Sequence, residues 1–172
     1  PDFFVKVIIN GHEFVSPVWE NTKIVSNPEW AVTVNVPNEE EFVDIKIQLW
    51  DWNPGVNKIC DISGDSEGYL DSFDVELIYS IKTGHWWGDD FAYWEPAMFD
   101  PSGYGRLNGC DDNSIYENDR DCELWFSIYQ NDFDGDGIPY WTEVNIYGTD
   151  PEVDNTGEDA DNDSVPIEGE HR

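Results

Sequence analysis

Apolar and polar residues alternate along several stretches of the first half of the chain. These stretches are FFVKVIIN (3–10), WAVTVNV (30–36), FVDIKIQLW (42–50) and SFDVELIYSI (72–81). A period of two residues puts every second side chain on one face of a β-strand. Clusters rich in Asn, Gly, Pro and acidic residues separate the stretches, as turns do. The pattern predicts an antiparallel β-sandwich.

Helical periodicity is absent from these stretches, so we expect helices only near residues 92–98 and in the C-terminal part of the chain. CELWFSIYQ (122–130) alternates like a further strand. Beyond it, Pro139 is placed to open a short helix and Gly148 to close it. The sequence therefore predicts a mainly β protein, with a sandwich over 1–130 and a C-terminal segment, 131–172, that carries short helices.

The C-terminal segment begins with NDFDGDGIPYWTE (131–143), which sets three carboxylates on alternate positions. Like charges about 4 Å apart repel by roughly 1 kcal/mol in bulk water and about 4 kcal/mol at an effective dielectric constant of 20, so we expect a cation among them. The spacing fits the calcium-loop pattern D-x-[DN]-x-[DN]-G-x5-E, in which the seventh position lends a backbone carbonyl. The predicted ligands are Asp132, Asp134, Asp136, the carbonyl of Ile138, and Glu143. A solvated acidic turn is the alternative.

DADNDSVPIEGE (159–170) repeats this loop. The predicted ligands of the second loop are Asp159, Asp161, Asp163, the carbonyl of Val165, and Glu170. Ser164 replaces the turn glycine, so the backbone does without a residue that readily adopts positive φ, and we expect a weaker site. A disordered acidic tail is the alternative here.

The sequence of 132–151 follows D-x-D-x-D-G-[IV]-P-x-x-x-E and ends in G-T-D-P. It resembles the thrombospondin type 3 repeat and its archaeal and bacterial relatives. The resemblance implies that calcium acts as a structural cement for loop-like chain and not as a trigger. Extracellular modules can use weak calcium sites because calcium is abundant outside cells, so we expect an extracellular or cell-surface location.

TKIVSNPEWAVTVNVPNEEEFVDIKIQLWDWN (22–53) resembles the C2 domain, a calcium- and phospholipid-binding sandwich. The opening PDFFVKV resembles that family's S-D-P-Y-V-K-V segment. The resemblance implies a second calcium site formed by Asp2, Asp51 and Asn53, with Asp61 as a candidate for a later acidic position. The alternative is that the WDW aromatic residues only fill the core and that Asp51 caps a turn.

The net charge of the chain limits the classes of partner that it can bind. The sequence has 38 acidic residues against 8 basic ones and a formal net charge of −30. This charge argues against nucleic acid and against anionic membranes, whereas calcium ions are natural partners. Adaptation to high salt is an alternative cause of the acidity. The aromatic content of 15% argues against disorder over most of the chain.

Aligned with the C2 family, the chain begins at the family's third strand, which would leave an open sheet edge beside residues 3–9. Unpaired backbone groups at such an edge template the addition of another strand. We expect the edge to be filled either by a strand from later in the chain, for which residues 122–130 are a candidate, or by a strand from another copy of the chain, which would produce an oligomer or a filament.

The three cysteines predict one disulfide. Cys110 and Cys122 flank the acidic loop CDDNSIYENDRDC and are expected to close it. Cys60 is then left as a buried thiol, as a link to another chain, or as a residue whose partner lies outside this sequence.

No motif for a nucleophile or a zinc-dependent hydrolase is present, so we expect no enzymatic activity. Trp86, Trp87 and Trp94 could form a sugar-stacking platform, although tryptophans in a small sandwich are more often core residues. Three functions remain open. The favoured one is an extracellular calcium-stiffened structural protein that assembles through strand complementation. The alternatives are a calcium-dependent carbohydrate- or cell-surface-binding module and an accessory domain of a secreted protease.

Overall fold

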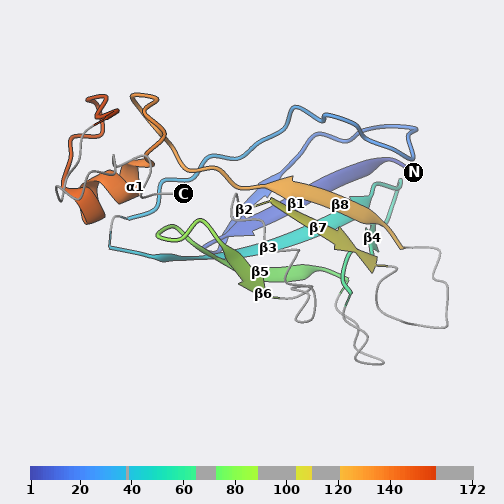
Figure 1. The fold of residues 1–172 in the computed structure, drawn as a ribbon. Helices are drawn as coiled ribbons and strands as arrows, with labels where there is room; N and C mark the ends of the chain where they lie inside the picture. Colours follow the sequence, from blue (N-terminus) through green and yellow to red (C-terminus); the bar gives the residue numbers. More distant parts are fainter. Residues whose placement is uncertain (38, 65–72, 89–103, 110–120, 158–172) are drawn as a thin grey trace.

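The computed structural model describes residues 1–172 except 38, 65–72, 89–103, 110–120 and 158–172. Its described part is mainly β and its strands pair antiparallel, as the sequence predicts. The larger sheet runs in the order β2-β1-β3-β5-β6, with β4 paired to the end of β3, and β7 and β8 form a second sheet (Figure 1). The strand bounds are β1 Phe3–Ile9, β2 His12–Val15, β3 Phe42–Asp51, β4 Lys58–Cys60, β5 Val75–Ser80, β6 Trp86–Gly88, β7 Tyr104–Asn108 and β8 Glu123–Ser127.

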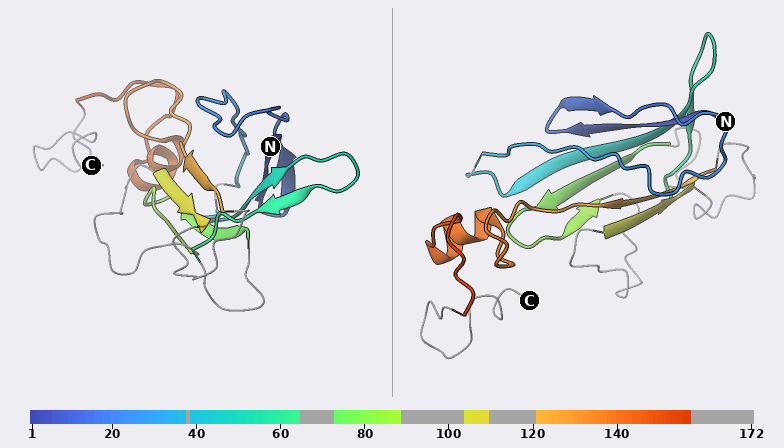
Figure 2. Two further views of the ribbon diagram at one scale, coloured as in Figure 1. Left: turned by 90° about the vertical axis from the view of Figure 1, so that its right-hand side faces the viewer. Right: turned by 90° about the horizontal axis from the view of Figure 1, so that it is seen from above.

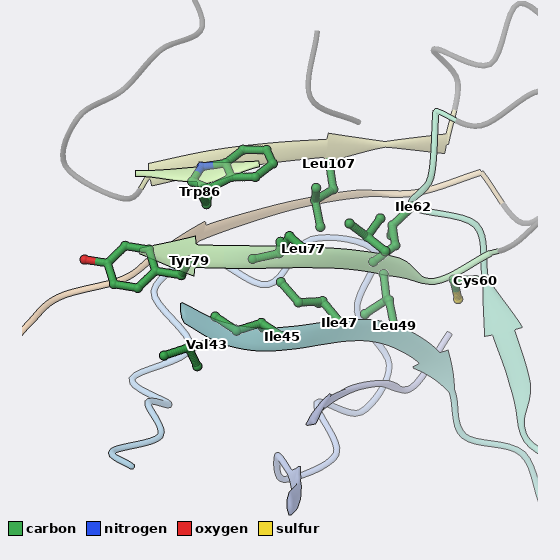
Figure 3. Close-up of a cluster of buried hydrophobic side chains, with 11 residues drawn as sticks. Val43, Ile45, Ile47, Leu49, Cys60, Ile62, Leu77, Tyr79, Trp86 and Leu107 are labelled. Carbon is green, nitrogen blue, oxygen red and sulfur yellow. The ribbon is translucent and has the colours of Figure 1, made fainter. Parts of the chain in front are cut away.

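The core lies between the two sheets (Figure 3). Alternate residues of β3 and β5 point into it, and Leu107 of β7 is fully buried against them. Trp86 meets Phe126 of β8 edge to face, with ring centroids 5.4 Å apart. The buried members of the core are Val43, Ile45, Ile47, Leu49, Cys60, Ile62, Val75, Leu77, Tyr79, Trp86 and Leu107. The described strands therefore have the sandwich-like layering that the period of two residues predicts.

The outer edge of β1 is covered by the residues that follow it. Asn10 and Gly11 both have positive φ, which is the backbone of a two-residue hairpin turn, and the chain returns as β2. Beyond β2, the Ser16 N–H donates to the Val5 carbonyl at 2.9 Å, and Phe3 and Trp19 exchange backbone hydrogen bonds of 3.1 and 2.8 Å. The expectation that β1 has an open edge is wrong, because residues 12–19 fill it. Residues 122–130 do not complete this edge, since β8 pairs with β7.

Residues 30–36 form no strand, although their sequence alternates. Trp30, Val32, Val34 and Val36 are half-buried while the residues between them are exposed, so the alternation does set which side chains face the protein. Within the described ranges, however, no backbone hydrogen bond is found for residues 25–36. The strand prediction is wrong here because a strand also needs a neighbouring chain for its N–H and C=O groups.

A groove of about 2410 Å³ runs beside this segment. It is lined by side chains of β1 and β3, by residues 23–36 and by β8 with the residues that follow it. Figure 2 shows residues 23–36 as an extended ribbon along the length of the sandwich. The groove therefore joins an apolar sheet face to a stretch of backbone without partners in the described chain.

The described part of the C-terminal segment, residues 131–157, lies at the end of the sandwich away from the N-terminus (Figures 1 and 2). It holds the short helix α1, Tyr140–Thr142, which continues as the π-helical turn η4, Glu143–Tyr147. Pro139 is the N-cap, and Gly148 ends the helix with φ of +69°, which confirms both predicted boundaries. The helix expected near 92–98 lies outside the described residues.

Replacement of Leu77 by Ala should lower the free energy of unfolding by about 3 kcal/mol, because the side chain is 2% exposed at the centre of the core. Ile24→Ala, which removes a similar volume at a position 79% exposed, is the matched control and should change it by less than about 0.5 kcal/mol. Urea unfolding measures both. Equal effects would contradict the position of the core.

Candidate metal centre

The carboxylates of Asp132, Asp134 and Asp136 converge on one point at the start of the C-terminal segment. Each offers an oxygen, and these oxygens all lie within 4.8 Å of one another. Calcium binds oxygen at about 2.3–2.6 Å, so ligands on opposite sides of one ion are roughly 5 Å apart. A single calcium ion can therefore contact all three carboxylates. Among the described residues, no other set of three His, Cys, Asp or Glu side chains meets this condition.

Backbone hydrogen bonds hold the three carboxylates in this arrangement. Asp132 accepts from the N–H groups of Gly135 at 2.8 Å and Gly137 at 3.0 Å, so its side chain folds back over the loop. Asp136 accepts from the Ile138 N–H at 2.8 Å. Gly137, at the sixth position of the pattern, has φ of +91°, which glycine adopts without strain. The loop backbone is thus the one that the motif predicts.

Glu143, the last predicted side-chain ligand, is fully buried. Its Oε1 accepts a hydrogen bond from the Thr149 hydroxyl at 3.1 Å. Its Oε2 has no hydrogen-bond partner in the described chain. Burial raises the pKa of Glu143, and the negative charges of the three aspartates raise it further. A carboxylate so placed is stable as an anion only if a cation lies beside it.

Other oxygens near the loop share this lack of partners. The buried side-chain atoms without a hydrogen-bond partner in the described residues are Gln130 Oε1, Asp134 Oδ2, Thr142 Oγ1, Glu143 Oε2 and Asn155 Oδ1. Four of these five belong to the calcium loop or to residues in contact with it. Such atoms are rare in native proteins and indicate a water or an ion. Burial raises the pKa of Asp134, as do the charges of its two neighbouring aspartates.

Asn155 is the member of this cluster that the sequence did not reveal. Its N–H donates to Asp136 Oδ2 at 3.1 Å, and its side chain is buried with its amide oxygen unpaired. It lies outside the calcium-loop pattern, so no spacing rule points to it. The fold brings it back beside Asp136 and makes it a further candidate ligand. The second predicted loop, with Asp159, Asp161, Asp163, Val165 and Glu170, lies outside the described residues.

Three of the four residues suggested by the C2 resemblance, Asp2, Asp51 and Asn53, meet, but they hydrogen-bond to one another. Asp51 accepts from the Asp2 N–H at 2.8 Å and from the Asn53 side-chain amide at 3.1 Å. Burial raises the pKa of Asp51, but these hydrogen bonds, together with the positive charges of the N-terminus and Lys58, lower the pKa overall. Asp61 is buried and accepts from the Ser63 N–H at 3.1 Å. In its contact with Asp51, Asn53 presents the N–H donors of its side-chain amide and not the amide oxygen.

The candidate sugar platform is only partly exposed. Trp86 is buried in the core, and Trp87 is 38% exposed with its ring packed edge to face on Phe42 at 5.6 Å. Trp94 lies outside the described residues, as does Cys110. Trp86 is therefore a core residue, which is the alternative to a sugar-binding platform for this stretch.

Comparisons with known proteins give no further assignment. No protein-family model, no curated protein and no solved structure matches this chain significantly. Among the helices that the structure describes, none has the length and apolar character to cross a bilayer.

In metal-free protein, the stability of the loop should fall as pH rises above about 4.5, the ordinary pKa of Glu143. The folded state holds the Glu143 proton more tightly than the unfolded state, so stability is present at low pH and is lost as pH rises through the raised pKa. Glu143→Gln has no proton to lose. At pH 7 in chelator we therefore expect slower amide hydrogen exchange across residues 142–147 in this variant than in the wild type.

In millimolar calcium we expect the opposite: amide hydrogen exchange should be faster in Glu143→Gln than in the wild type, because the variant lacks one of the proposed calcium ligands. Glu152→Gln, an exposed neutralisation in the same segment, is the control and should behave as the wild type in both conditions. Faster exchange in Glu143→Gln than in the wild type in chelator would show that the carboxylate is not a source of repulsion.

Proposed function

We propose that this chain is an extracellular structural protein in which bound calcium stiffens the C-terminal segment. The observation that carries the proposal is the fully buried Glu143, whose Oε2 has no hydrogen-bond partner among the described residues and which is close enough to Asp132, Asp134 and Asp136 to feel their charges. The ligands are these four side chains together with the carbonyl of Ile138. We propose a second, weaker site of the same kind over 159–170.

The donor set favours calcium over other divalent ions. All proposed donors are oxygens, whereas structural zinc sites and copper sites are built mainly from His nitrogen and Cys sulfur. Magnesium demands near-ideal octahedral geometry and keeps several waters, which suits a cage of four carboxylates poorly. Calcium accepts six to eight oxygens at flexible angles. The unpaired oxygens of Asp134, Glu143 and Asn155 fit that larger shell.

The contacts around the loop favour a structural role for the proposed calcium ion over a regulatory one. Phe133 packs edge to face on Tyr140 at 5.6 Å, so the loop is tied to α1 by an apolar contact as well. The Asp136–Asn155 hydrogen bond ties it to the chain that follows η4. An ion at this point would fix three parts of the segment together. Calcium levels outside cells would keep such a site filled, which supports the extracellular location.

Calcium binding should stabilise the C-terminal segment, and its affinity should depend on the carboxylates of the loop. We expect calcium to protect residues 131–157 from limited proteolysis, and Asp134→Asn to weaken binding, measured by titration calorimetry, at least about tenfold, since calcium affinity follows ligand charge. Glu152→Gln should leave both unchanged. Identical digestion of the wild type in calcium and in chelator would overturn the proposal.

We further propose that the protein assembles with copies of itself by strand addition into the groove. Support comes from residues 25–36, for which no backbone hydrogen bond is found within the described chain, and from the apolar lining of the groove. Backbone groups in this state are satisfied by an added strand, and alternate side chains fill the apolar positions. Calcium bound to each copy would reduce the repulsion between two chains of net charge −30.

Assembly should be visible by size-exclusion chromatography with light scattering in calcium. We expect oligomers in the wild type. Val34→Lys, which places a charge at a half-buried groove position, should abolish them, whereas Thr33→Lys, on the exposed side, should not. A wild type that stays monomeric at every concentration would rule out assembly, and calcium binding would be unaffected by that result.

A further inference from the structure

Two cysteines meet where the two sheets join. Cys60 is the last residue of β4, which pairs with β3 in the larger sheet, and Cys122 directly precedes β8 in the smaller one. The residues Asp61 and Asp121 form a parallel bridge. The Cys122 N–H donates to the Asp61 carbonyl at 2.8 Å. The backbones that carry the two cysteines are therefore directly hydrogen-bonded.

The thiols of these cysteines also face each other. Cys60 is 5% exposed, Cys122 is half-buried, and the two side chains share a hydrogen bond. Figure 3 shows Cys60 at one end of the core, beside Leu49, with which it pairs. A disulfide requires neighbouring backbones and sulfurs close to one another, and the backbone bridge and the hydrogen bond between the two side chains favour both conditions.

Gly109 keeps the junction tight. Its N–H donates to the Cys122 carbonyl at 3.1 Å. A Cβ at this position would lie 2.4 Å from the Asp61 carbonyl oxygen, so only glycine lets the end of β7 approach the end of β4 this closely. The close approach fixes the spacing between the chain segments that carry the two sulfurs.

We propose that Cys60 and Cys122 form a disulfide that joins the two sheets. This goes beyond the proposed calcium function and does not depend on it. The pairing of Cys122 with Cys110, expected from sequence proximity, has one partner outside the described residues. The contact between Cys60 and Cys122 is present within the fold.

The bond can form by exchange with a small disulfide such as oxidised glutathione. The Cys122 sulfur, after losing its proton, attacks one glutathione sulfur, which forms a mixed disulfide and releases one glutathione thiolate. The Cys60 sulfur then loses its proton and attacks the Cys122 sulfur, which forms the Sγ–Sγ bond and releases the second glutathione. The two cysteine protons end on the two glutathione thiols, so the two cysteines are oxidised and one glutathione disulfide is reduced.

The crosslink would fix β8 at both of its ends. At its far end, the Gln130 side-chain amide donates to the Tyr79 hydroxyl at 3.1 Å and to the Ile81 carbonyl. At its near end, the described contacts include the backbone bonds beside Cys122 and, toward β7, the ion pair between Arg106 and Glu123. A disulfide there closes a longer loop than a Cys110–Cys122 bond does, and longer loops constrain the unfolded chain more.

The test is peptide mapping of the full chain, refolded in calcium with oxidised and reduced glutathione. After alkylation of remaining thiols and digestion at acid pH without reductant, mass spectrometry should find Cys60 linked to Cys122 and Cys110 alkylated. A dominant Cys110–Cys122 peptide, a linkage between chains, or three alkylated cysteines would each overturn the proposal.

Variants extend the test to stability. Cys110→Ser should keep the crosslink, and reduction should lower its Tm by roughly 5–15 °C, as in the wild type. Cys60→Ser, a change of similar size at the proposed partner, should show no such reduction-dependent shift. A Cys60→Ser variant with the same shift as the wild type would assign the stabilising bond to another pair.

Discussion

The burial of Glu143 against three aspartates is the constraint on which the C-terminal segment depends. Four carboxylates that interact in a partly buried loop repel one another, and Glu143 also loses its hydration. Either protons or a cation must offset this cost. A proton on Glu143 offsets the cost at low pH, as the raised pKa indicates, and the proposed divalent ion would offset it once that proton is lost. The same ion would draw together Asp136, η4 and the region of Asn155, and the segment would be ordered by its charge instead of by a core.

The sandwich follows a different rule, because its backbone groups must find partners. The hairpin turn at Asn10 and Gly11 lets residues 12–19 cover the edge of β1, so the edge next to the first strand is closed within the chain. Residues 25–36 have no comparable neighbour in the described chain. The backbone hydrogen-bonding groups of β1 have thus found partners within the chain, and those of residues 25–36 have found none in the described residues. That contrast is the basis of the proposed assembly.

Alternation along the chain was sufficient to predict β1, β3, β5 and β8, because each buries one face over five residues or more. It missed β2, β4 and β6, whose three or four residues are too few to show a period, and also β7, whose sequence YGRLN does not alternate between apolar and polar residues. It predicted a strand at 30–36 that is absent, since periodicity reports which side faces the protein and carries no information on backbone partners. The cluster of Asp132, Asp134 and Asp136 was predicted residue by residue because its geometry is local. Asn155 and the contact between Cys60 and Cys122 were not, since each depends on how distant segments meet.

Anomalous diffraction from crystals grown in millimolar calcium tests the central claim most directly. The account predicts an anomalous peak bounded by Asp132, Asp134, Asp136 and Glu143, with carboxylate oxygens at about 2.3–2.6 Å. Well-ordered density that shows only water among these side chains, or Glu143 turned out to solvent, would contradict it.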